Sequence, residues 1–389
     1  MTVTVDVAVV GLGAMGSAAL YELTARGVRA LGIEQFEPGH DRGSSHGESR
    51  VIRLSYFEHP SYVPLLHRAY AKWRALEADC GETILTVTGI LEAGYPGAPV
   101  VQGSLLASRE HGLAHETLDA AEVARRYPAF RLPENWTAMF QPDGGFLRPE
   151  RAIANFLGGA TRRGATVWTQ TRVGAIRPGP AGVVIETDRG AVEAGHVIVA
   201  AGPWIGAFAP ELAPHLALTR QVLGWFGPSD RALVGPDRFP VFALQSEDDQ
   251  WYGFPDFAGT GVKAASHIMG RGLANADALR QDGDDADAAQ IRAGLRYIPA
   301  ADGPLMRMRT CIYTRTPDAF FVIDRAAASP RVILASPCSG HGFKFASVIG
   351  EIAAELALDG RTPHDISRFR ADRFDPSLRA ERSNPAREA

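Results

Sequence analysis

Positive charge and long apolar runs are both scarce in this sequence. Its 40 lysine and arginine residues are outnumbered by 44 acidic residues, which gives a net charge of −4 at pH 7. A protein with this charge lacks the basic surface that usually binds nucleic acids or anionic membranes. No stretch approaches the roughly 20 apolar residues that cross a bilayer. We therefore expect no nucleic-acid partner and no membrane partner.

Cysteine is equally rare, with Cys80, Cys311 and Cys338 the only three in 389 residues. An odd number of scattered cysteines does not form a disulfide framework and is typical of reducing compartments. The first residues, MTVTVDVAVVGLG, lead directly into an apolar strand, without the basic segment and cleavage site of a secretory signal. We expect a cytoplasmic protein.

Lysine is the most unusual shortage, because only Lys72, Lys263 and Lys344 occur among the 40 basic residues. Where arginine is the usual cation, a lysine can mark a place that needs a compact charge with an adjustable pKa. Lys72 lies in an ordinary helical stretch, PLLHRAYAKWRALEADC, and is interpreted as a chance survivor. Lys263 and Lys344 lie in motif-like surroundings and are candidate functional residues.

The residues that are abundant describe a globular protein. Apolar residues make up 46% of the chain and charged residues 22%, which permits a sizeable buried core. A chain of 389 residues exceeds the size of one small core, so we expect two intertwined or sequential domains.

Residues 4–35 have the pattern of a βαβ unit that binds a dinucleotide. The apolar run VDVAVV is followed by GLGAMG, a helical stretch and a second apolar run, RALGIEQ. Gly11, Gly13 and Gly16 match G-x-G-x-x-G, in which glycine lets a pyrophosphate approach the backbone at a helix N-terminus. Glu34 ends the second strand and is placed to bind ribose hydroxyls. Glycine-rich helix packing is the alternative interpretation.

A later apolar segment, AGHVIVAAGPWIG (residues 194–206), indicates FAD more than NAD, because FAD proteins commonly return a late strand to the same sheet. Alternating segments such as GATVWTQTRVGAI and GVVIETDRGAVEA precede it and predict antiparallel strands. A long acidic helix is expected over ANADALRQDGDDADAAQIRAGL, residues 274–295.

The predicted fold is therefore mixed α/β (α+β), with a Rossmann-like FAD-binding domain assembled from discontinuous segments and a sheet-based substrate domain. The expected FAD-binding segments are 1–84, 146–214 and 306–380. The expected substrate-binding segments are 85–145 and 215–305, and residues 381–389 are expected to form a polar tail.

The segment EPGHDRGSSHGESRVIRLSY, which begins at Glu37, is too polar for a core and predicts a loop. It holds His46, Arg50 and Arg53. A solvated basic loop is one interpretation. The functional interpretation places the loop against the flavin, where an arginine can bind a carboxylate through two parallel hydrogen bonds.

GTGVKAASHIMG places Lys263 and His267 on one face of either a helix or a strand. The ammonium group makes this pair a poor metal site, and no other group of His, Cys, Asp and Glu has metal-ligand spacing. The sequence also lacks a G-x-S-x-G nucleophile elbow. We expect no metal and no hydrolytic chemistry.

VILASPCSGHGFKFASVIGEIAAELAL (residues 332–358) predicts a strand, a glycine-rich turn and a helix. The turn, which includes Gly340, Gly342 and Phe343, would present backbone N–H groups at the positive end of the helix. Such an end suits a flavin ring that gains negative charge on reduction. Lys344 follows in the first helical turn. An ordinary strand-to-helix junction would not explain both glycines and this rare lysine.

Together these stretches resemble the monomeric sarcosine oxidase and N-methyltryptophan oxidase family of FAD-dependent amine oxidases. The resemblance extends from residue 9 to residue 345 and is carried by VVGLGAMGSAA, GSSHGESRVIR, WYGFP, GVKAASH, CIYTRTPDAFFVID and SGHGFKF. It implies an FAD-binding domain made of separate segments and a second domain whose sheet covers the reactive face of the flavin.

The resemblance also implies a role for Cys311, which from its own segment is most simply a buried inert thiol. By analogy it attaches the flavin through an 8α-S-cysteinyl thioether. The other implied roles are Lys263 near flavin N5 for the reaction with oxygen; His267, Tyr252 and Tyr313 in the substrate cavity; His46 and Arg50 beside the flavin; Arg53 and Lys344 on the substrate carboxylate; and Val173 as a backbone contact to the adenine part of FAD.

The implied reaction is hydride transfer from a secondary or N-methyl α-amino acid to flavin N5, hydrolysis of the imine, and reoxidation by O2 to H2O2. The alternative is an oxidase or desaturase of a cyclic amino acid in the biosynthesis of a natural product. A flavoprotein that only binds a ligand is disfavoured by the joint presence of Lys263, Arg53 and Lys344. The partners are then a small amino acid and O2, and we expect a monomer.

Cys338 departs from the family pattern, in which a bulky or apolar residue more often precedes the Ser-Gly-His-Gly turn. A small side chain there would enlarge or reshape the cavity, which puts sarcosine itself in doubt as the substrate. Cys338 is also a second candidate thiol for flavin attachment, although Cys311 has the matching CxYTxTPD context.

Overall fold

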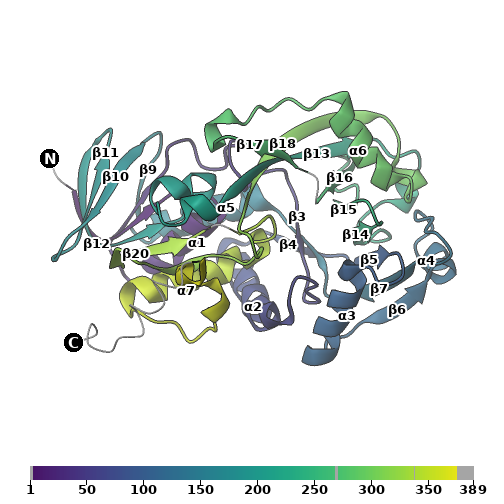
Figure 1. Ribbon diagram of the computed structural model, residues 1–389, viewed down its shortest axis with the longest axis horizontal. Coiled ribbons are helices and arrows are strands. Elements are labelled where there is room, and N and C mark those ends of the chain that lie inside the picture. Colours follow the sequence, from purple (N-terminus) through teal and green to yellow (C-terminus); the bar gives the residue numbers. More distant parts are fainter. Residues whose placement is uncertain (1–2, 268–269, 337, 375–389) are drawn as a thin grey trace.

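The computed structural model describes residues 3–267, 270–336 and 338–374. Two halves lie side by side along the long axis, each built on its own sheet (Figure 1). The mixed α/β fold predicted from the sequence is confirmed. The predicted polar tail, 381–389, lies outside the described residues.

The first sheet has eight strands in the described part of the chain, and its centre is parallel. β1 (Val3–Val10) pairs with β2 (Ala30–Ile33) on one side and with β12 (Gly190–Val199) on the other, and β12 also pairs with β20 (Ser329–Ala335). Parallel strands are covered on both faces, which explains the continuous apolar run at the end of β1. The remaining strands are β9 (Thr166–Trp168), β10 (Val173–Pro178), β11 (Val183–Thr187) and β19 (Ile323–Ala326).

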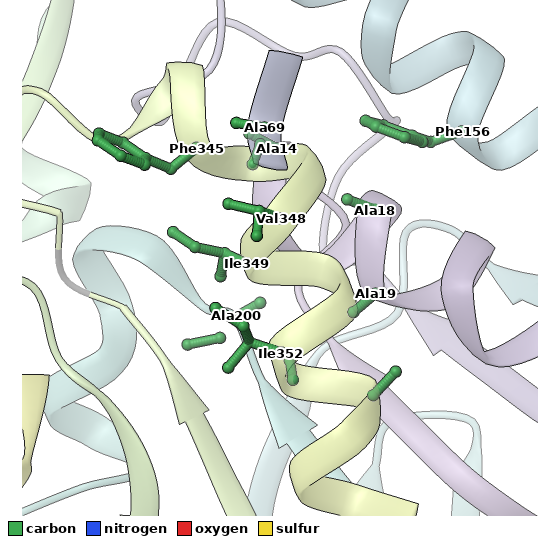
Figure 2. Close-up of a cluster of buried hydrophobic side chains, with 14 of the residues drawn as sticks. Ala14, Ala18, Ala19, Ala69, Phe156, Ala200, Phe345, Val348, Ile349 and Ile352 are labelled. Atoms are coloured by element: carbon green, nitrogen blue, oxygen red, sulfur yellow. The ribbon is translucent and has the colours of Figure 1, made fainter. Parts of the chain in front are cut away.

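Helices cover the first sheet, and two of them are in close contact (Figure 2). α1 (Ala14–Ala25) follows the glycine loop, and α7 (Ala346–Leu358) packs across it through Val348, Ile349 and Ile352. A Cβ atom on Gly350 would lie 2.5 Å from the backbone of Ala18, so glycine allows this approach. α2 (Val63–Cys80) and α5 (Pro149–Arg162) complete the layer.

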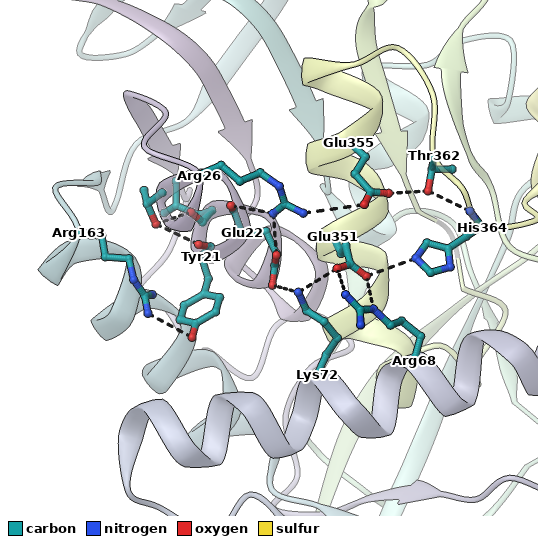
Figure 3. Close-up of polar contacts among 12 residues, drawn as sticks. Tyr21, Glu22, Arg26, Arg68, Lys72, Arg163, Glu351, Glu355, Thr362 and His364 are labelled. Carbon is teal, nitrogen blue, oxygen red and sulfur yellow. Dashed lines mark hydrogen bonds and ion pairs between the residues drawn. The ribbon is translucent and has the colours of Figure 1, made fainter.

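A cluster of charges, in which the carboxylates are buried and the cations are more exposed, joins these helices (Figure 3). Lys72 of α2 lies 2.5 Å from Glu22 of α1 and 3.2 Å from Glu351 of α7. Arg68 also binds Glu351, at 2.5 Å. Lys72, to which the sequence assigned no role, therefore links three helices.

The second sheet has nine strands in the described residues, mostly antiparallel. The helices α3 (Pro99–His111), α4 (Ala120–Arg126) and α6 (Asp285–Leu295) accompany it. Its strands are β17 (Arg271–Leu273), β13 (Ala217–Phe226), β16 (Val262–Ser266), β15 (Gln250–Phe254), β14 (Val241–Gln245), β5 (Ile90–Gly94), β7 (Thr137–Gln141) and β6 (Glu116–Asp119), with β18 (Leu305–Arg315) paired to β13. A small third sheet contains β3 (Arg50–Ile52), β8 (Gly145–Leu147) and β4 (Leu85–Val87).

The register of the second sheet brings distant residues into one row. Ala265 lies opposite Tyr252, Tyr252 opposite Ala243, and Ala243 beside Glu92. Directly paired residues point to the same face of a sheet, and so do residues two apart along a strand. Lys263 is therefore on this face as well.

The long acidic helix predicted over residues 274–295 is wrong. α6 begins only at Asp285, after Asp284, which has an extended backbone and forms a capping box with Asp287. Carboxylates favour the N-cap over a helix interior, so this cap stops the helix from extending backwards. The domain boundaries proposed from the sequence stay a prediction.

Short 3₁₀ turns occupy several connections. They are Pro60–Tyr62, Gly202–Ala207, Ala213–His215, Arg231–Leu233, Ala276–Ala278, Pro299–Ala301, Phe343–Phe345, Ser367–Phe369 and Ala371–Phe374.

Candidate active site

A cavity of about 500 Å³ lies between the carboxyl edge of the first sheet and one face of the second. This edge is where open α/β sheets bind ligands. The site residues predicted from the sequence that line the cavity are Gly11, Gly13, Glu34, Arg50, Arg53, Val173, Tyr252, His267, Tyr313, Gly340, Gly342, Phe343 and Lys344. The predicted residues outside this lining are Gly16, His46, Lys263 and Cys311.

The glycine loop forms one end of the cavity. Gly11 has φ = 87°, and a Cβ atom there would lie 2.6 Å from the carbonyl oxygen of Ala200. A Cβ on Gly16 would lie 1.8 Å from the Gly11 oxygen, so this glycine lets α1 pack against the loop. Glu34 accepts hydrogen bonds from the backbone N–H groups of Leu12 (2.7 Å) and Phe36 (3.0 Å). These features fit a dinucleotide, with open backbone near the phosphates and a carboxylate at the end of β2.

The loop after β2 crosses the cavity and contacts both halves of the molecule. Ser45 Oγ accepts a hydrogen bond from the N–H of Ala14, and Ser44 Oγ donates to the carbonyl of Ile312. His46 is buried, and its Nε2 has no hydrogen-bond partner among the described residues. Burial, together with the charges of Arg50 and Lys263, lowers the pKa of His46 to about 3. The His46 imidazole is therefore neutral at physiological pH.

Lys263 is buried on the face of the second sheet, with its amine held by the same loop. Nζ donates to the carbonyl oxygens of Gly47 (2.6 Å) and Ser49 (2.7 Å) and lies 3.2 Å from Ser49 Oγ. Burial, followed by the charge of Arg50, holds the pKa of Lys263 well below its usual value. The two carbonyl acceptors favour the charged form and thus oppose this shift.

Glu150, at the start of α5, holds the loop in this position. Its carboxylate accepts hydrogen bonds from the N–H groups of Gly47 (2.6 Å) and Glu48 (3.0 Å). Gly47 (φ = 100°) and Glu48 (φ = 68°) are both in the left-handed region, which is unfavourable for glutamate. The hydrogen bonds of Lys263 to this loop therefore depend on a loop conformation that Glu150 stabilises.

Arg53 is paired with two carboxylates that the sequence analysis missed. Its Nη2 lies 2.7 Å from Glu58, and its Nε lies 3.2 Å from Glu92. Glu58 lines the cavity, whereas Glu92 is fully buried behind Arg53. An acidic residue five positions after a motif arginine was the available signal for Glu58. No local signal distinguishes Glu92, which β5 brings from far along the chain.

The two carboxylates differ in protonation. Burial opposes ionisation of Glu58, but Arg53, His341 and Lys344 together lower its pKa to about 2. Burial raises the pKa of Glu92 to about 7 despite Arg53. At neutral pH the cavity therefore contains an ionised Glu58 that already occupies Arg53.

Lys344 lies beside this pair. Its Nζ donates to the carbonyl of His341 at 2.8 Å and lies 3.5 Å from the hydroxyl of Tyr56. His341 Nδ1 is 2.6 Å from the same hydroxyl. Burial, followed by the charge of Arg53, lowers the pKa of Lys344 to about 7. Lys344 can thus change its charge near neutral pH.

Three aromatic side chains, which line the same cavity as the basic residues, form one of its walls. The hydroxyl of Tyr313 lies 3.4 Å from that of Tyr252 and 3.5 Å from Nδ1 of His267. Burial lowers the pKa of His267 to about 3, so this imidazole is neutral. Gly340 has φ = 86°, and a Cβ atom there would lie 2.5 Å from the Tyr313 ring. Glycine thus lets the turn before α7 lie directly against this wall.

The two candidate thiols differ in position. Cys311 on β18 is buried, next to the cavity-lining residues Ile312 and Tyr313, whereas Cys338 itself lines the cavity. Burial raises the pKa of both thiols, to about 12 for Cys338. Arg50 and Lys263 oppose the shift at Cys311, and Lys344 opposes it at Cys338.

One group of potential metal ligands occurs in the described residues, away from the cavity. Glu351, Glu355 and His364 bring their ligand atoms within 4.8 Å of one another (Figure 3). Arg68 and Lys72 already contact Glu351, and such cations disfavour a bound metal ion. Among the described helices, none combines the length and apolarity needed to cross a membrane.

Comparisons with known proteins agree with this geometry. The family model of the FAD dependent oxidoreductases matches residues 6–356. A monomeric sarcosine oxidase of Streptomyces avermitilis is 39% identical over 376 residues, 95% of this chain and 97% of the relative. An N-methyl-L-tryptophan oxidase of Yersinia pestis is 35% identical over 373 residues, 95% of this chain and 99% of the relative.

Solved structures show the same fold. NikD, an unusual amino acid oxidase essential for nikkomycin biosynthesis, superposes with a TM-score of 0.84 at 25% identity and covers 95% of this chain and 98% of its own. An L-proline dehydrogenase from P. horikoshii superposes with a TM-score of 0.83 at 20% identity and covers 97% and 99%. The predicted family and FAD as its cofactor are confirmed, whereas covalent attachment of the flavin stays a prediction: the chain belongs to the FAD-dependent oxidoreductases and is a relative of the monomeric sarcosine oxidases.

Proposed function

We propose that this protein oxidises a secondary or N-methyl α-amino acid, releases an imine that water hydrolyses, and reduces O2 to H2O2. The observation that carries the proposal is that two cationic side chains, Arg53 and Lys344, line the same cavity as Tyr252, Tyr313 and His267, and that the charge of Arg53 acts on Lys344. A carboxylate bound by the two cations would direct the adjacent C–N bond towards the aromatic wall.

Arg53 and Lys344 would bind the substrate carboxylate. The carboxylate would have to replace Glu58, which lies 2.7 Å from Arg53 and accepts its hydrogen bond. An arginine fork and a lysine point charge are complementary in such a site, because the fork sets orientation and the lysine adds attraction. The main effect of this anchor is to align the substrate, which can lower the activation free energy by several kcal/mol.

When bound, FAD would supply the acceptor for a hydride from the carbon next to the substrate nitrogen. The residues around it would exclude water and favour a neutral amine. Neutral His267 and the hydroxyls of Tyr252 and Tyr313 offer hydrogen-bond acceptors but no cation, so they would not repel or protonate the nitrogen. Glu58 could receive the proton that a substrate ammonium loses, once it has left Arg53.

Lys263 would serve the reaction with oxygen. Oxygen gains negative charge as it is reduced, and a fixed ammonium in a dry site stabilises that charge strongly. Trp225 and Phe254 surround Nζ at 5.5 and 4.5 Å from their ring centres and keep water away. The hydrogen bonds to Gly47 and Ser49 hold the charge in place.

Cys311 is our proposed attachment point for the flavin. Covalent attachment needs a thiolate, and two cations, Arg50 and Lys263, favour ionisation of Cys311. Cys338 lines the cavity itself, but burial raises its pKa to about 12 and one cation, Lys344, opposes the shift. The monomeric state and the cytoplasmic location stay predictions.

The proposal is tested by a panel of amines added to the purified holoenzyme without oxygen. Bleaching of the flavin by sarcosine or another N-methyl amino acid, followed by formaldehyde and peroxide formation in air, is the expected result. A flavin that no amine of the panel bleaches would contradict an oxidase function.

Oxidation of a cyclic amino acid is the second candidate function. The likeness to NikD and the small Cys338 beside the cavity favour it. A ring substrate such as pipecolate would bleach the flavin without releasing formaldehyde, so the same panel separates the two functions.

A further inference from the structure

Gln250 is a buried amide with no hydrogen-bond partner for its side chain among the described residues. It lines the cavity and is only 5% exposed. Its backbone is fully used: its N–H donates to Asp249 Oδ1 at 2.7 Å, and its carbonyl accepts from the N–H of His267 at 2.7 Å. With the backbone groups engaged, the side-chain amide is what Gln250 can offer to the cavity that it lines, as both donor and acceptor.

The cross-strand partner of Gln250 is a second glutamine, Gln245, whose side chain does form a hydrogen bond within the protein. Gln245 lies opposite Gln250 in the β14–β15 pair, and its Oε1 accepts a hydrogen bond from the N–H of Val100 at 2.9 Å. Gln245 does not line the cavity. The amide of Gln250 is absent from the fully buried unpaired atoms of the described residues, so it is open to the cavity and can pair with a molecule that enters it.

The position of Gln250 places this partner at the far end of the substrate. Phe254 lies opposite Lys263 and Tyr252 lies opposite Ala265, so Gln250, the first residue of β15, is at the end of the strand away from Lys263. Gln250 is two residues beyond Tyr252 on the same face, roughly 7 Å further along the strand. Sarcosine has no side chain with which to reach it.

The cavity also has room for a longer substrate. Ala243, opposite Tyr252, and Cys338 are both small side chains in its lining. Glu58 is ionised in the same cavity and disfavours a second acidic group on the substrate. A neutral hydrogen-bonding group therefore fits this end better than a carboxylate.

We propose that Gln250 determines specificity by hydrogen-bonding a neutral polar group, such as a hydroxyl or an amide, on the side chain of an N-methyl or other secondary amino acid. This assignment rests on the proposed function of the same cavity. It names the substrate class more narrowly: a side chain several atoms long that ends in a hydrogen-bonding group.

The test compares pairs of substrates that have similar side chains and differ mainly in whether the side chain ends in a neutral polar group. The pairs are N-methyltyrosine with N-methylphenylalanine, and N-methylglutamine with N-methylmethionine. Anaerobic flavin reduction, followed over a range of concentrations, yields a limiting rate and a dissociation constant for each. A site built to bind a polar group rejects the analogue that lacks it, because its own buried group then stays unpaired.

The wild-type holoenzyme should prefer the polar member of at least one pair by tenfold or more, mainly through the dissociation constant. Gln250→Leu should reduce this preference to within about twofold, and Gln245→Leu, the matched control, should retain it. Gln250→Met, which is unbranched, serves as the second variant if the leucine does not fold.

Two results would overturn the assignment while leaving the proposed function intact: no preference within either pair in the wild type, or an unchanged preference in both Gln250 variants. Failure of every N-methyl amino acid to reduce the flavin would instead overturn the proposed function, and the assignment with it.

Discussion

Lys263 and Gly47 are joined by a 2.6 Å hydrogen bond although 216 residues separate them in the sequence. The bond connects the face of the second sheet to the loop that follows the dinucleotide-binding strand. It therefore fixes the buried amine of Lys263 where the two halves of the molecule meet, which is the position that our proposal assigns to the reaction with oxygen.

Lys263→Met should separate the two halves of the catalytic cycle. Anaerobic reduction of the flavin by an amino acid should change little, whereas reoxidation should slow on the order of a hundredfold, because a buried stabilising charge is lost. Stopped-flow mixing of reduced enzyme with oxygen measures this. Lys72→Met, which removes a lysine far from the cavity, is the control, and normal reoxidation in Lys263→Met would refute the role.

Arg53→Ala and Glu58→Gln should have opposite effects on carboxylate binding. Acetate, used as a probe, competes with Glu58 for Arg53, so Glu58→Gln should tighten acetate binding and Arg53→Ala should weaken it by roughly tenfold or more. Flavin difference spectra give the dissociation constants, and acetamide is the neutral control. Equal binding of acetate and acetamide in the wild type would contradict a carboxylate site.

Acetate binding should also weaken as the pH rises through about 7. Lys344, with a pKa lowered to about 7, is charged below that pH and neutral above it, while acetate stays ionised throughout. Ionisation of Glu92, whose pKa is raised to about 7, adds negative charge over the same range and acts in the same direction.

Titrations of acetate between pH 6 and 9 test this dependence. Lys344→Met should bind acetate more weakly than the wild type at pH 6, and its affinity should change little with pH. Glu92→Gln should remove only the smaller part of the pH dependence that comes from Glu92. A pH profile that is unchanged in Lys344→Met would exclude this lysine as the titrating group.

Wild-type protein precipitated with acid should stay yellow if Cys311 attaches the flavin. Cys311→Ser should release FAD into the supernatant, because serine cannot form the thioether. Cys338→Ser is the matched control and should keep the colour in the pellet. The reverse pattern would identify Cys338 as the attachment point, and a colourless wild-type pellet would show that the flavin is not covalently bound.

Lys72→Met should destabilise the fold without altering the cavity. The change leaves Glu22 and Glu351 with fewer cations in a mostly buried cluster, and Arg26 and Arg68 compensate only in part. We expect a loss of about 2 kcal/mol in the free energy of unfolding, measured in urea. Arg29→Met, which breaks an exposed pair with Asp6, should change stability little.

The same cluster should weaken in acid. Burial opposes ionisation of Glu351, but hydrogen bonds from Arg68 and His364 hold its pKa below the usual 4.5. The stabilisation is therefore complete above pH 4.5 and is lost as the pH falls through the lowered value. Lys72→Met should show a smaller loss of stability between pH 5 and pH 3 than the wild type; an equal loss would place the acid sensitivity elsewhere.

Features with a local cause could be predicted from the sequence. Gly11, Gly16 and Glu34 belong to one short unit in which spacing along the chain sets position in space, so the dinucleotide site followed directly. The same holds for Gly340 and Lys344, which share a turn. The prediction of the long acidic helix was wrong for an equally local reason. Asp284 was expected inside the helix, but it is the N-cap at which the helix begins.

By itself, the sequence determined the family, the cofactor and the rare lysines that are candidate functional residues, because motifs and composition can be recognised without the fold. Only the tertiary structure decided what those residues meet. The position of Glu92 at Arg53 and that of Gly47 at Lys263 depend on strand register and on contacts between distant segments. Such contacts leave no periodic pattern in the chain, since each is made by a single pair of residues that the fold brings together.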